Sequence, residues 1–180
     1  MKVNVLLINP ICRLPTMIPL GLGYIASILM REGHNIEILD INAFGYSAPE
    51  VEKLINRLKF DIVGIGGLSS TYKYVKWLAE VIKHHHPSVP VVAGNMVSTA
   101  YPELLLNNTL IDIAVIDEGE LTFKEIVSVI KTGGDLKEVK GISYKCNGNI
   151  IKNPPRERIS NLDSLPFPAW DLFPMEIYLN

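Results

Sequence analysis

Short apolar runs alternate with helical patterns five times along the chain, and this alternation constrains the fold more than any other feature. The runs are rich in β-branched residues and leucine, and the helical patterns repeat apolar residues every three or four positions, as Leu22, Ile25, Ala26 and Leu29 do. Strands that are separated by helices pair in parallel through right-handed crossovers, with helices on both faces. The pattern therefore predicts a doubly wound α/β domain over residues 1–135, whose five parallel strands are expected at 3–8, 35–40, 62–66, 89–93 and 113–116.

The pattern changes after residue 135. Residues 136–153 contain two short strand-like runs joined by Asn147-Gly148, the strongest two-residue signal for a β-hairpin. Residues 154–180 carry five prolines and no periodic apolar pattern, which is typical of an extended linker. The same segment has Phe167, Trp170 and Phe173, so part of it is expected to pack against another surface.

Composition excludes several classes of function. The chain has 17 Lys and Arg against 19 Asp and Glu, so no basic face is expected for DNA or RNA. Its two cysteines, Cys12 and Cys146, cannot form a disulfide framework or a metal-binding cysteine cluster. The first residues are typical of a strand rather than of a signal peptide, and the longest uncharged stretch, 14–30, is interrupted by proline and glycine. We therefore expect a cytoplasmic protein without a nucleic-acid or membrane partner.

Ligands of open parallel sheets bind at the carboxyl ends of the strands, where the strand order reverses. The first such strand exit, residues 9–12, lacks the G-x-G-x-x-G motif that dinucleotide-binding domains place there. It also lacks the acidic residues of a phospho-receiver domain and the Ser-, Thr- and Gly-rich loop of a flavodoxin-like FMN site. The sequence therefore disfavours a dinucleotide-binding domain, a phospho-receiver domain and an FMN site.

The third and fourth strand exits are rich in glycine, with Gly64, Gly66 and Gly67 at one and Gly94 at the other. Bare backbone allows a flat or elongated ligand to lie against the sheet. Nearby polar side chains that could hydrogen-bond such a ligand are Ser69, Ser70, Thr71 and Asn95. The same glycines are equally compatible with tight packing of helices on the strands, and the sequence leaves both interpretations open.

Several motifs occur in a characteristic order. They are Asn9-Pro10, the Pro-Leu-Gly-Leu-Gly-Tyr-Ile-Ala segment at 19–26, Val-Gly-Ile-Gly at 63–66, Val-Val-Ala-Gly-Asn at 91–95 with Pro102-Glu103 after it, Ile-Asp-Glu-Gly-Glu at 116–120, and Leu-Pro-Phe-Pro-Ala-Trp-Asp-Leu-Phe at 165–173. Together they resemble the cobalamin-binding domain of B12-dependent radical SAM proteins, over nearly the whole chain. The last motif resembles the segment that leads into the radical SAM barrel, so residues 154–180 would be the linker to that domain.

The resemblance implies a flavodoxin-like, or Rossmann-like, sheet that holds cobalamin at its strand exits. It implies that Asn9 and Pro10 border the corrin, and that the nucleotide tail lies in a groove. The residues it assigns to this groove are Gly66, Leu68, Ser69 and Ser70 along its floor, with Gly94, Asn95, Asp117, Glu118 and Gly119 closing the far side.

Two positions depart from the family's pattern. Gly66-Gly67-Leu68 stands where Ser-x-Leu is typical, and Ala93-Gly94 stands where Gly-Gly is typical. We expect the absent hydroxyl to remove a hydrogen bond worth about 1 kcal/mol, and the Ala93 methyl group to narrow the groove.

Two absences refine the expectation. No histidine occurs within residues 1–33, so cobalamin would be bound base-off, without a histidine as lower cobalt ligand. No C-x-x-x-C-x-x-C motif occurs, so S-adenosylmethionine and a 4Fe-4S cluster would belong only to the radical SAM domain outside this sequence. We expect no catalytic residue, no protein metal site and no autonomous catalysis.

The sequence therefore predicts the cobalamin-binding module of a B12-dependent radical SAM enzyme, with methyltransferase as the expected class. Its partners would be cobalamin and the radical SAM domain. One alternative is a docking scaffold of a radical SAM protein that no longer binds corrinoid. Another is an independent flavodoxin-like domain for a small molecule, which the lack of a nucleophile–base pair at the strand exits disfavours as an enzyme.

Overall fold

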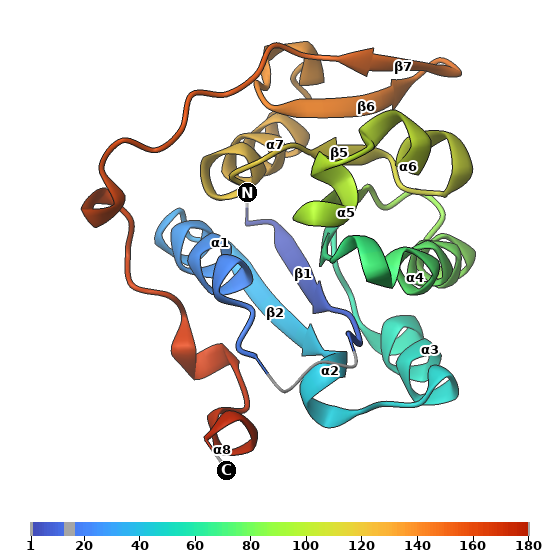
Figure 1. The fold of residues 1–180 in the computed structure, drawn as a ribbon, viewed down its shortest axis with the longest axis vertical. Coiled ribbons are helices and arrows are strands. Elements are labelled where there is room, and N and C mark those ends of the chain that lie inside the picture. The colour runs from blue at the N-terminus through green and yellow to red at the C-terminus, as the bar shows by residue number, and fades with distance from the viewer. Residues whose placement is uncertain (1, 13–16, 180) are drawn as a thin grey trace.

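A computed structural model describes residues 2–12 and 17–179, and these residues form a seven-stranded sheet with helices on both faces (Figure 1). The strand order is β2-β1-β3-β4-β5-β6-β7, and β1 to β5 are parallel. The order 2-1-3-4-5 is that of flavodoxin-like folds, so the predicted fold class is confirmed. The strands are β1 (Asn4–Asn9), β2 (Asn35–Asp40), β3 (Ile62–Gly66), β4 (Val91–Gly94), β5 (Ile113–Val115), β6 (Ile142–Cys146) and β7 (Asn149–Lys152).

Apart from three single-turn helices of four residues each, the helices lie where the apolar periodicity places them, and their ends follow local chemistry. The backbone N–H and the hydroxyl of Ser47 both donate to the Glu50 carboxylate in the predicted capping box, at 2.8 and 2.6 Å. Gly133 ends a later helix in the left-handed region, at φ 69°. The helices are α1 (Leu20–Arg31), α2 (Ile41–Phe44), α3 (Ala48–Arg57), α4 (Tyr72–His85), α5 (Met96–Thr99), α6 (Pro102–Asn108), α7 (Glu120–Thr132) and α8 (Met175–Tyr178).

Two apolar layers sandwich the sheet. Helices α3, α4 and α6 cover one face, where Leu6 and Ile8 of β1 are buried. Helices α1 and α7 cover the other face, where Val5 and Leu7 of the same strand are buried. Successive residues of a strand point to opposite faces, so β1 supplies both layers of the core.

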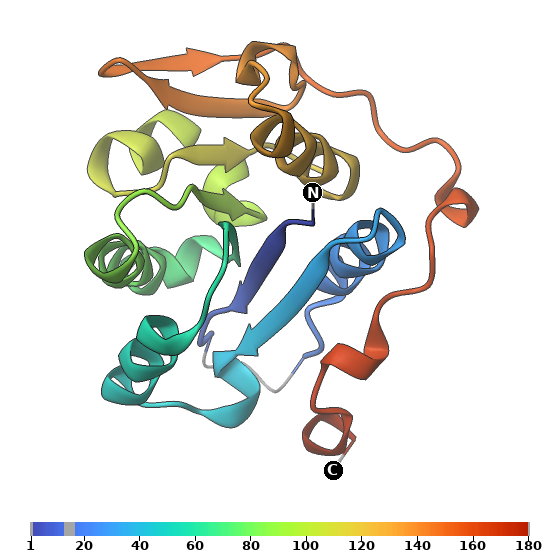
Figure 2. The ribbon, with the colours of Figure 1, turned by 180° about the vertical axis from the view of Figure 1, so that it is seen from behind.

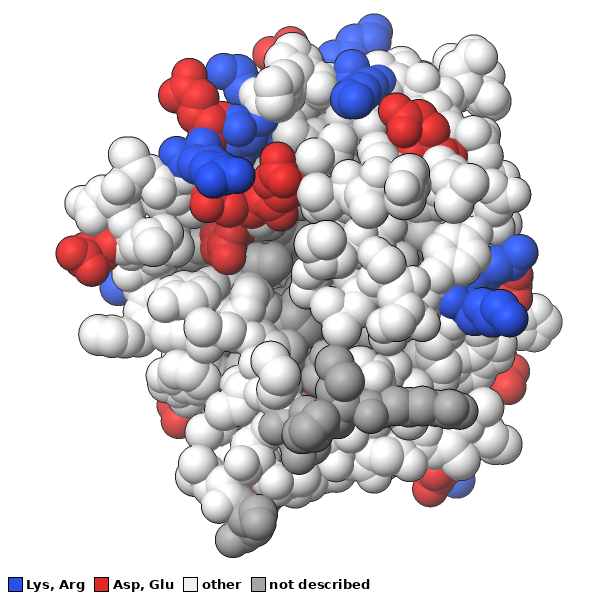
Figure 3. All heavy atoms as spheres, viewed as in Figure 1, with Lys and Arg blue, Asp and Glu red and all other residues white. Residues whose placement is uncertain are grey.

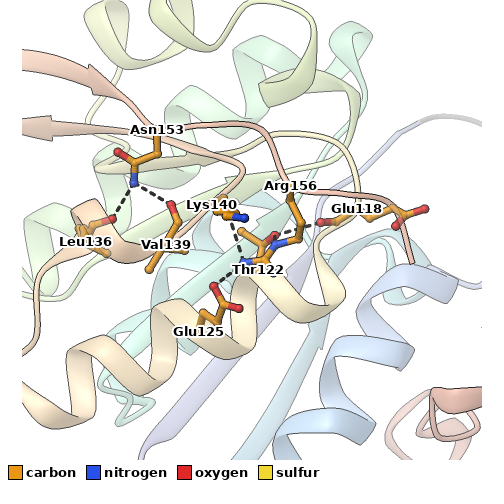
Figure 4. A network of polar contacts seen from close by, with 8 residues as sticks. All are labelled: Glu118, Thr122, Glu125, Leu136, Val139, Lys140, Asn153 and Arg156. Carbon is orange, nitrogen blue, oxygen red and sulfur yellow. Dashed lines mark hydrogen bonds and ion pairs between the residues drawn. The ribbon is translucent and has the colours of Figure 1, made fainter. Parts of the chain in front are cut away.

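The predicted hairpin continues the central sheet. Strand β6 pairs antiparallel with β5, Ser143 lying opposite Ala114, and β7 pairs antiparallel with β6. Asn153, which is buried just after β7, donates from its amide to the carbonyl oxygens of Leu136 and Val139, both at 2.7 Å. These two hydrogen bonds join the end of the hairpin to its beginning (Figure 4).

Residues 154–179, called the tail below, run back along the α1 side of the sheet and end near α2 (Figures 1 and 2). The side chain of Phe173 is 6% exposed and packs in the layer of α1 and α7, whereas Phe167 is 90% exposed. The Ala169 N–H donates to the Gly23 carbonyl oxygen at 3.1 Å, and the Ser27 hydroxyl donates to the Phe167 carbonyl oxygen. The segment predicted as a linker is therefore docked on α1. The last residue of that segment, 180, lies outside the described residues.

On the face that Figure 3 shows, basic and acidic side chains lie next to one another toward the upper part and the rim. Within residues 2–12 and 17–179, no helix is both long enough and apolar enough to cross a membrane.

Candidate functional site

A cavity of about 630 Å³ lies at the carboxyl ends of β1, β3, β4 and β5, on the face that α1 and α7 cover. It includes the carboxyl ends of the neighbouring strands β1 and β3, the point at which the strand order reverses. Its size falls within the range of small-molecule and cofactor sites. Its wall is largely apolar, because the inward-facing side chains of the strands and two helices form it. These are Leu7, Leu22, Ile25, Val92, Val115 and Phe123.

The four glycines of the third and fourth strand exits have two different roles. A Cβ atom on Gly64 would lie 2.7 Å from the ring of Phe123, and one on Gly67 would lie 2.9 Å from Val75. These two glycines permit close packing. A Cβ on Gly66 would meet only Leu22, at an ordinary 3.6 Å, and one on Gly94 would meet nothing within 4 Å. Gly66 and Gly94 therefore leave open space in the cavity, as the ligand interpretation requires.

Two strand exits at the cavity have unusual backbone conformations. Asn95 has φ 67° and Asp117 has φ 60°, in the left-handed region that side chains rarely adopt. The Asn95 side chain accepts a hydrogen bond from the Met96 N–H at 2.7 Å, and the Asp117 N–H donates to the Thr99 hydroxyl at 3.0 Å. Such conformations are held by their surroundings and gather at functional sites.

The loop before α7 and the first residue of that helix give the cavity an acidic edge, formed by Asp117, Glu118 and Glu120. Glu118 accepts a hydrogen bond from the Ile159 N–H at 2.8 Å, which joins this edge to the tail. Oε2 of Glu120 is buried and has no hydrogen-bond partner among the described residues. Burial, reinforced by the charge of Glu118, raises the pKa of the Glu120 carboxyl, although backbone N–H groups at the helix start act in the opposite direction.

Arg158 is the only basic side chain among the described residues that line the cavity. It comes from the tail, and the neighbouring Arg156 fixes its position. The Arg156 guanidinium donates to the Thr122 hydroxyl at 2.8 Å and forms an ion pair with Glu125, both on α7 (Figure 4). The tail therefore places one cation beside the acidic edge.

Most residues of the predicted site meet in this cavity. The nine that line it are Asn9, Pro10, Gly66, Leu68, Gly94, Asn95, Asp117, Glu118 and Gly119. Ser69 and Ser70 do not line it, and the Ser69 hydroxyl instead donates to the Met96 carbonyl oxygen at 3.3 Å. Thr71, two residues further on, takes a place in the wall.

Sequence reasoning missed Glu120, Arg158 and the apolar wall. The wall has a recognisable signal, since Leu7, Val92 and Val115 occupy the strand positions whose side chains share a face with Gly66 and Gly94. Glu120 belongs to the Ile-Asp-Glu-Gly-Glu motif and could have been included with it. Arg158 has no such signal, because only the docking of the tail brings it to the cavity.

We expect Glu120→Gln to raise the melting temperature at pH 7. The raised pKa means that the folded chain disfavours the carboxylate, so this glutamate reduces stability where it is ionised. The gain should shrink as the pH falls through the raised folded-state value and vanish near the ordinary glutamate pKa of about 4.3. Each 1 kcal/mol of added stability corresponds to a rise in Tm of roughly 2–4 °C in a chain of this size.

Thermal unfolding of both chains between pH 4 and pH 8 measures this difference. Glu157→Gln, at an exposed carboxylate of the tail, is the matched control and should leave Tm unchanged. A Glu120→Gln chain no more stable than the wild type at pH 7 would contradict the assignment of a destabilising carboxylate.

The sheet order and the glycine-lined cavity at its carboxyl edge define a flavodoxin-like cofactor-binding domain. Residues 8–127 match the sequence model of the B12 binding domain. The chain belongs to this family of B12-binding domains.

The chain is similar in sequence to parts of longer proteins. An uncharacterized methyltransferase of Pyrococcus horikoshii is 40% identical over 161 residues, which are 89% of this chain and 35% of that protein. The cytidylyl-2-hydroxyethylphosphonate methyltransferase of Streptomyces wedmorensis is 27% identical over a match that covers 97% of this chain and 41% of that protein. The chain thus spans about two fifths or less of the length of these relatives.

Solved structures share the fold. The cobalamin-dependent S-adenosylmethionine radical enzyme OxsB, with aqua-cobalamin and S-adenosylmethionine bound, matches with a TM-score of 0.82 at 23% identity, over 95% of this chain and 24% of that one. The radical S-adenosylmethionine methyltransferase TsrM from Kitasatospora setae, with cobalamin and a 4Fe-4S cluster bound, matches with a TM-score of 0.78 at 20% identity, over 92% of this chain and 31% of that one.

Proposed function

We propose that this chain binds one cobalamin at the carboxyl edge of its sheet. The observation that carries the proposal is the open space at Gly94, where a Cβ would meet no atom within 4 Å. Together with Gly66 it leaves a bare strip of sheet, against which the flat base of the nucleotide tail can lie. Membership of the B12-binding family supports this choice of ligand.

Different residues of the cavity then contact different parts of the cobalamin. The apolar wall covers the base of the nucleotide tail and excludes water, and the side-chain amide of Asn95 and the backbone near Asp117 lie at the far side. Asn9 and Pro10, at the exit of β1, border the corrin. Cobalamin supplies, when bound, a cobalt centre that can carry a methyl group.

We infer that the parent enzyme is a B12-dependent radical SAM enzyme, with methyl transfer as its reaction class. The names of the Pyrococcus and Streptomyces relatives support methyl transfer, and those of the two solved enzymes support radical chemistry. S-adenosylmethionine and the 4Fe-4S cluster would then belong to a radical SAM domain that acts as the partner of this one. The motif at 165–173 and the tail before it are the part of this chain that would adjoin that domain.

We expect the chain to retain one equivalent of hydroxocobalamin in the base-off form. None of the described residues that line the cavity is a histidine, so none offers an imidazole to the cobalt, while the nucleotide base is held in the cavity. Incubation with hydroxocobalamin, desalting and an absorption spectrum measure both the stoichiometry and the base-off state. A chain that retains no colour would favour the scaffold alternative, and a base-on spectrum like that of the free cofactor would contradict burial of the nucleotide base.

A further inference from the structure

A buried carboxylate connects the cavity to the tail. Asp40, at the end of β2, is 2% exposed. Its Oδ1 atom accepts hydrogen bonds from the Asn9 side-chain amide at 2.8 Å and from the Ala43 N–H at 3.0 Å. Its Oδ2 atom accepts from the Tyr178 hydroxyl, which belongs to α8 in the tail. Asn9 and Ala43 therefore donate to one oxygen of this buried carboxylate, and Tyr178 donates to the other.

The two ends of this connection differ in role. Asn9 lines the cavity at the exit of β1. Tyr178 lies 138 residues beyond Asp40 and reaches it only because the tail folds back to α2. Burial and the neighbouring Asp40 raise the pKa of the Tyr178 hydroxyl, and a hydrogen bond with Asn9 opposes this by less, so the hydroxyl remains a proton donor throughout the neutral range.

The tail also contacts α1 through residues that do not take part in the Tyr178–Asp40 hydrogen bond. Phe173 is buried against α1, and a Cβ on Gly23 would lie 3.0 Å from Pro168, so the tail fits α1 closely. The Ala169 N–H also donates to the Gly23 carbonyl oxygen. Removing the Tyr178 hydroxyl alone therefore leaves an apolar docking surface in place.

We propose that Asp40 is a positioning residue for Asn9, and that the Tyr178–Asp40 hydrogen bond couples docking of the tail to occupancy of the cavity by cobalamin. The coupling rests on the proposed function. With Tyr178 in place, the Asp40 carboxylate has all its donors and presents a fixed acceptor to the Asn9 amide. Without the Tyr178 hydroxyl, Oδ2 of the buried carboxylate lacks its donor. The carboxylate must then turn or bind a water molecule, and this weakens its hydrogen bond to the Asn9 amide.

Coupling of this kind is reciprocal. If a docked tail improves the binding of cobalamin by fixing Asn9, bound cobalamin must stabilise the docked tail by the same factor. The tail would thereby report to an adjoining domain whether the cofactor is present. The contact that carries this signal is a single hydroxyl, so it can be removed without changing the size of the side chain.

The test compares the full chain with Tyr178→Phe. We expect the affinity for hydroxocobalamin, measured by titration of its absorption spectrum, to fall about tenfold, the effect of losing a hydrogen bond to a charged group. In the wild type, hydroxocobalamin should slow hydrogen exchange of amides in residues 165–179, and in Tyr178→Phe this slowing should be absent. Tyr101→Phe removes a hydroxyl from a side chain that is 71% exposed, and it is the matched control.

A double substitution tests whether the effect passes through Asp40. In an Asp40→Asn chain that still folds, adding Tyr178→Phe should cause little further loss of affinity, because the charge that joins the two sites is gone. Wild-type affinity and tail protection in Tyr178→Phe would overturn the coupling alone. Failure of the wild-type chain to bind hydroxocobalamin would overturn the proposed function, and the coupling with it.

Discussion

Gly94→Val is expected to weaken hydroxocobalamin binding by about 100-fold, or about 2.7 kcal/mol, so that no colour is retained after desalting. The folded chain tolerates a side chain at this position, because a Cβ there meets no atom within 4 Å and the backbone is outside the left-handed region. The valine methyl groups instead occupy the space that the nucleotide base requires. Gly66→Val should act in the same direction, since its Cβ meets only the Leu22 side chain at an ordinary distance.

The control for this prediction is Asn149→Val, which places the same side chain on an exposed strand position outside the cavity. Both variants should unfold within about 0.5 kcal/mol of the wild type, so that a difference in binding reports on the cavity. Full retention of cobalamin by Gly94→Val would place the ligand elsewhere. A Gly94→Val chain that unfolds would be replaced by Gly94→Ala, which should show a smaller loss of affinity for the same reason.

Phe173→Ala should lower the free energy of unfolding by about 3 kcal/mol, which corresponds to roughly 6–12 °C in Tm for a chain of this size. The ring is 6% exposed and packs in the layer of α1 and α7, so its removal leaves a cavity against α1. This value is at the low end for a phenylalanine-to-alanine change because the tail can leave as a unit, which limits the loss.

Phe167→Ala provides a closely matched comparison in the same segment. This ring is 90% exposed, so its removal should change stability by no more than about 0.5 kcal/mol. Thermal and denaturant-induced unfolding of the two variants measures the contrast. Equal stabilities would mean that the tail does not dock on α1 in solution.

Hydrophobic period and local turn chemistry were sufficient to predict the parallel sheet, its longer helices and the hairpin. The five parallel strands and the hairpin at Asn147-Gly148 form as expected. The inner strands β1, β3, β4 and β5 are buried on both faces, and this burial leaves continuous apolar runs in their sequences. The short helices α2, α5 and α8 were not predicted, since four residues make a single turn and show no apolar period. The sequence also did not show that the hairpin pairs with β5, because a short amphipathic strand does not specify its partner.

The site was predictable where it consists of backbone at strand exits, and less so elsewhere. Gly66 and Gly94 were recognised because parallel strands bring their carboxyl ends to one edge. Which glycines serve packing could not be predicted, because the answer depends on side chains such as Phe123 that meet Gly64 across the layer. The docked path of the tail arises from contacts that lie 34 and 41 positions apart along the chain next to Arg158, and 138 positions apart at Tyr178, and such contacts leave no local pattern.

The antiparallel hairpin also determines how the sheet ends. Without it, β5 would present an unpaired row of backbone groups, the kind of edge on which other chains can add strands and aggregate. Pairing with β6 moves that edge outward to β7, which is four residues long and carries exposed Asn149 and Lys152. At the opposite edge, β2 exposes Asn35 and Glu37. A short or charged outer strand discourages edge-to-edge pairing, so the hairpin protects the sheet from joining other copies of itself.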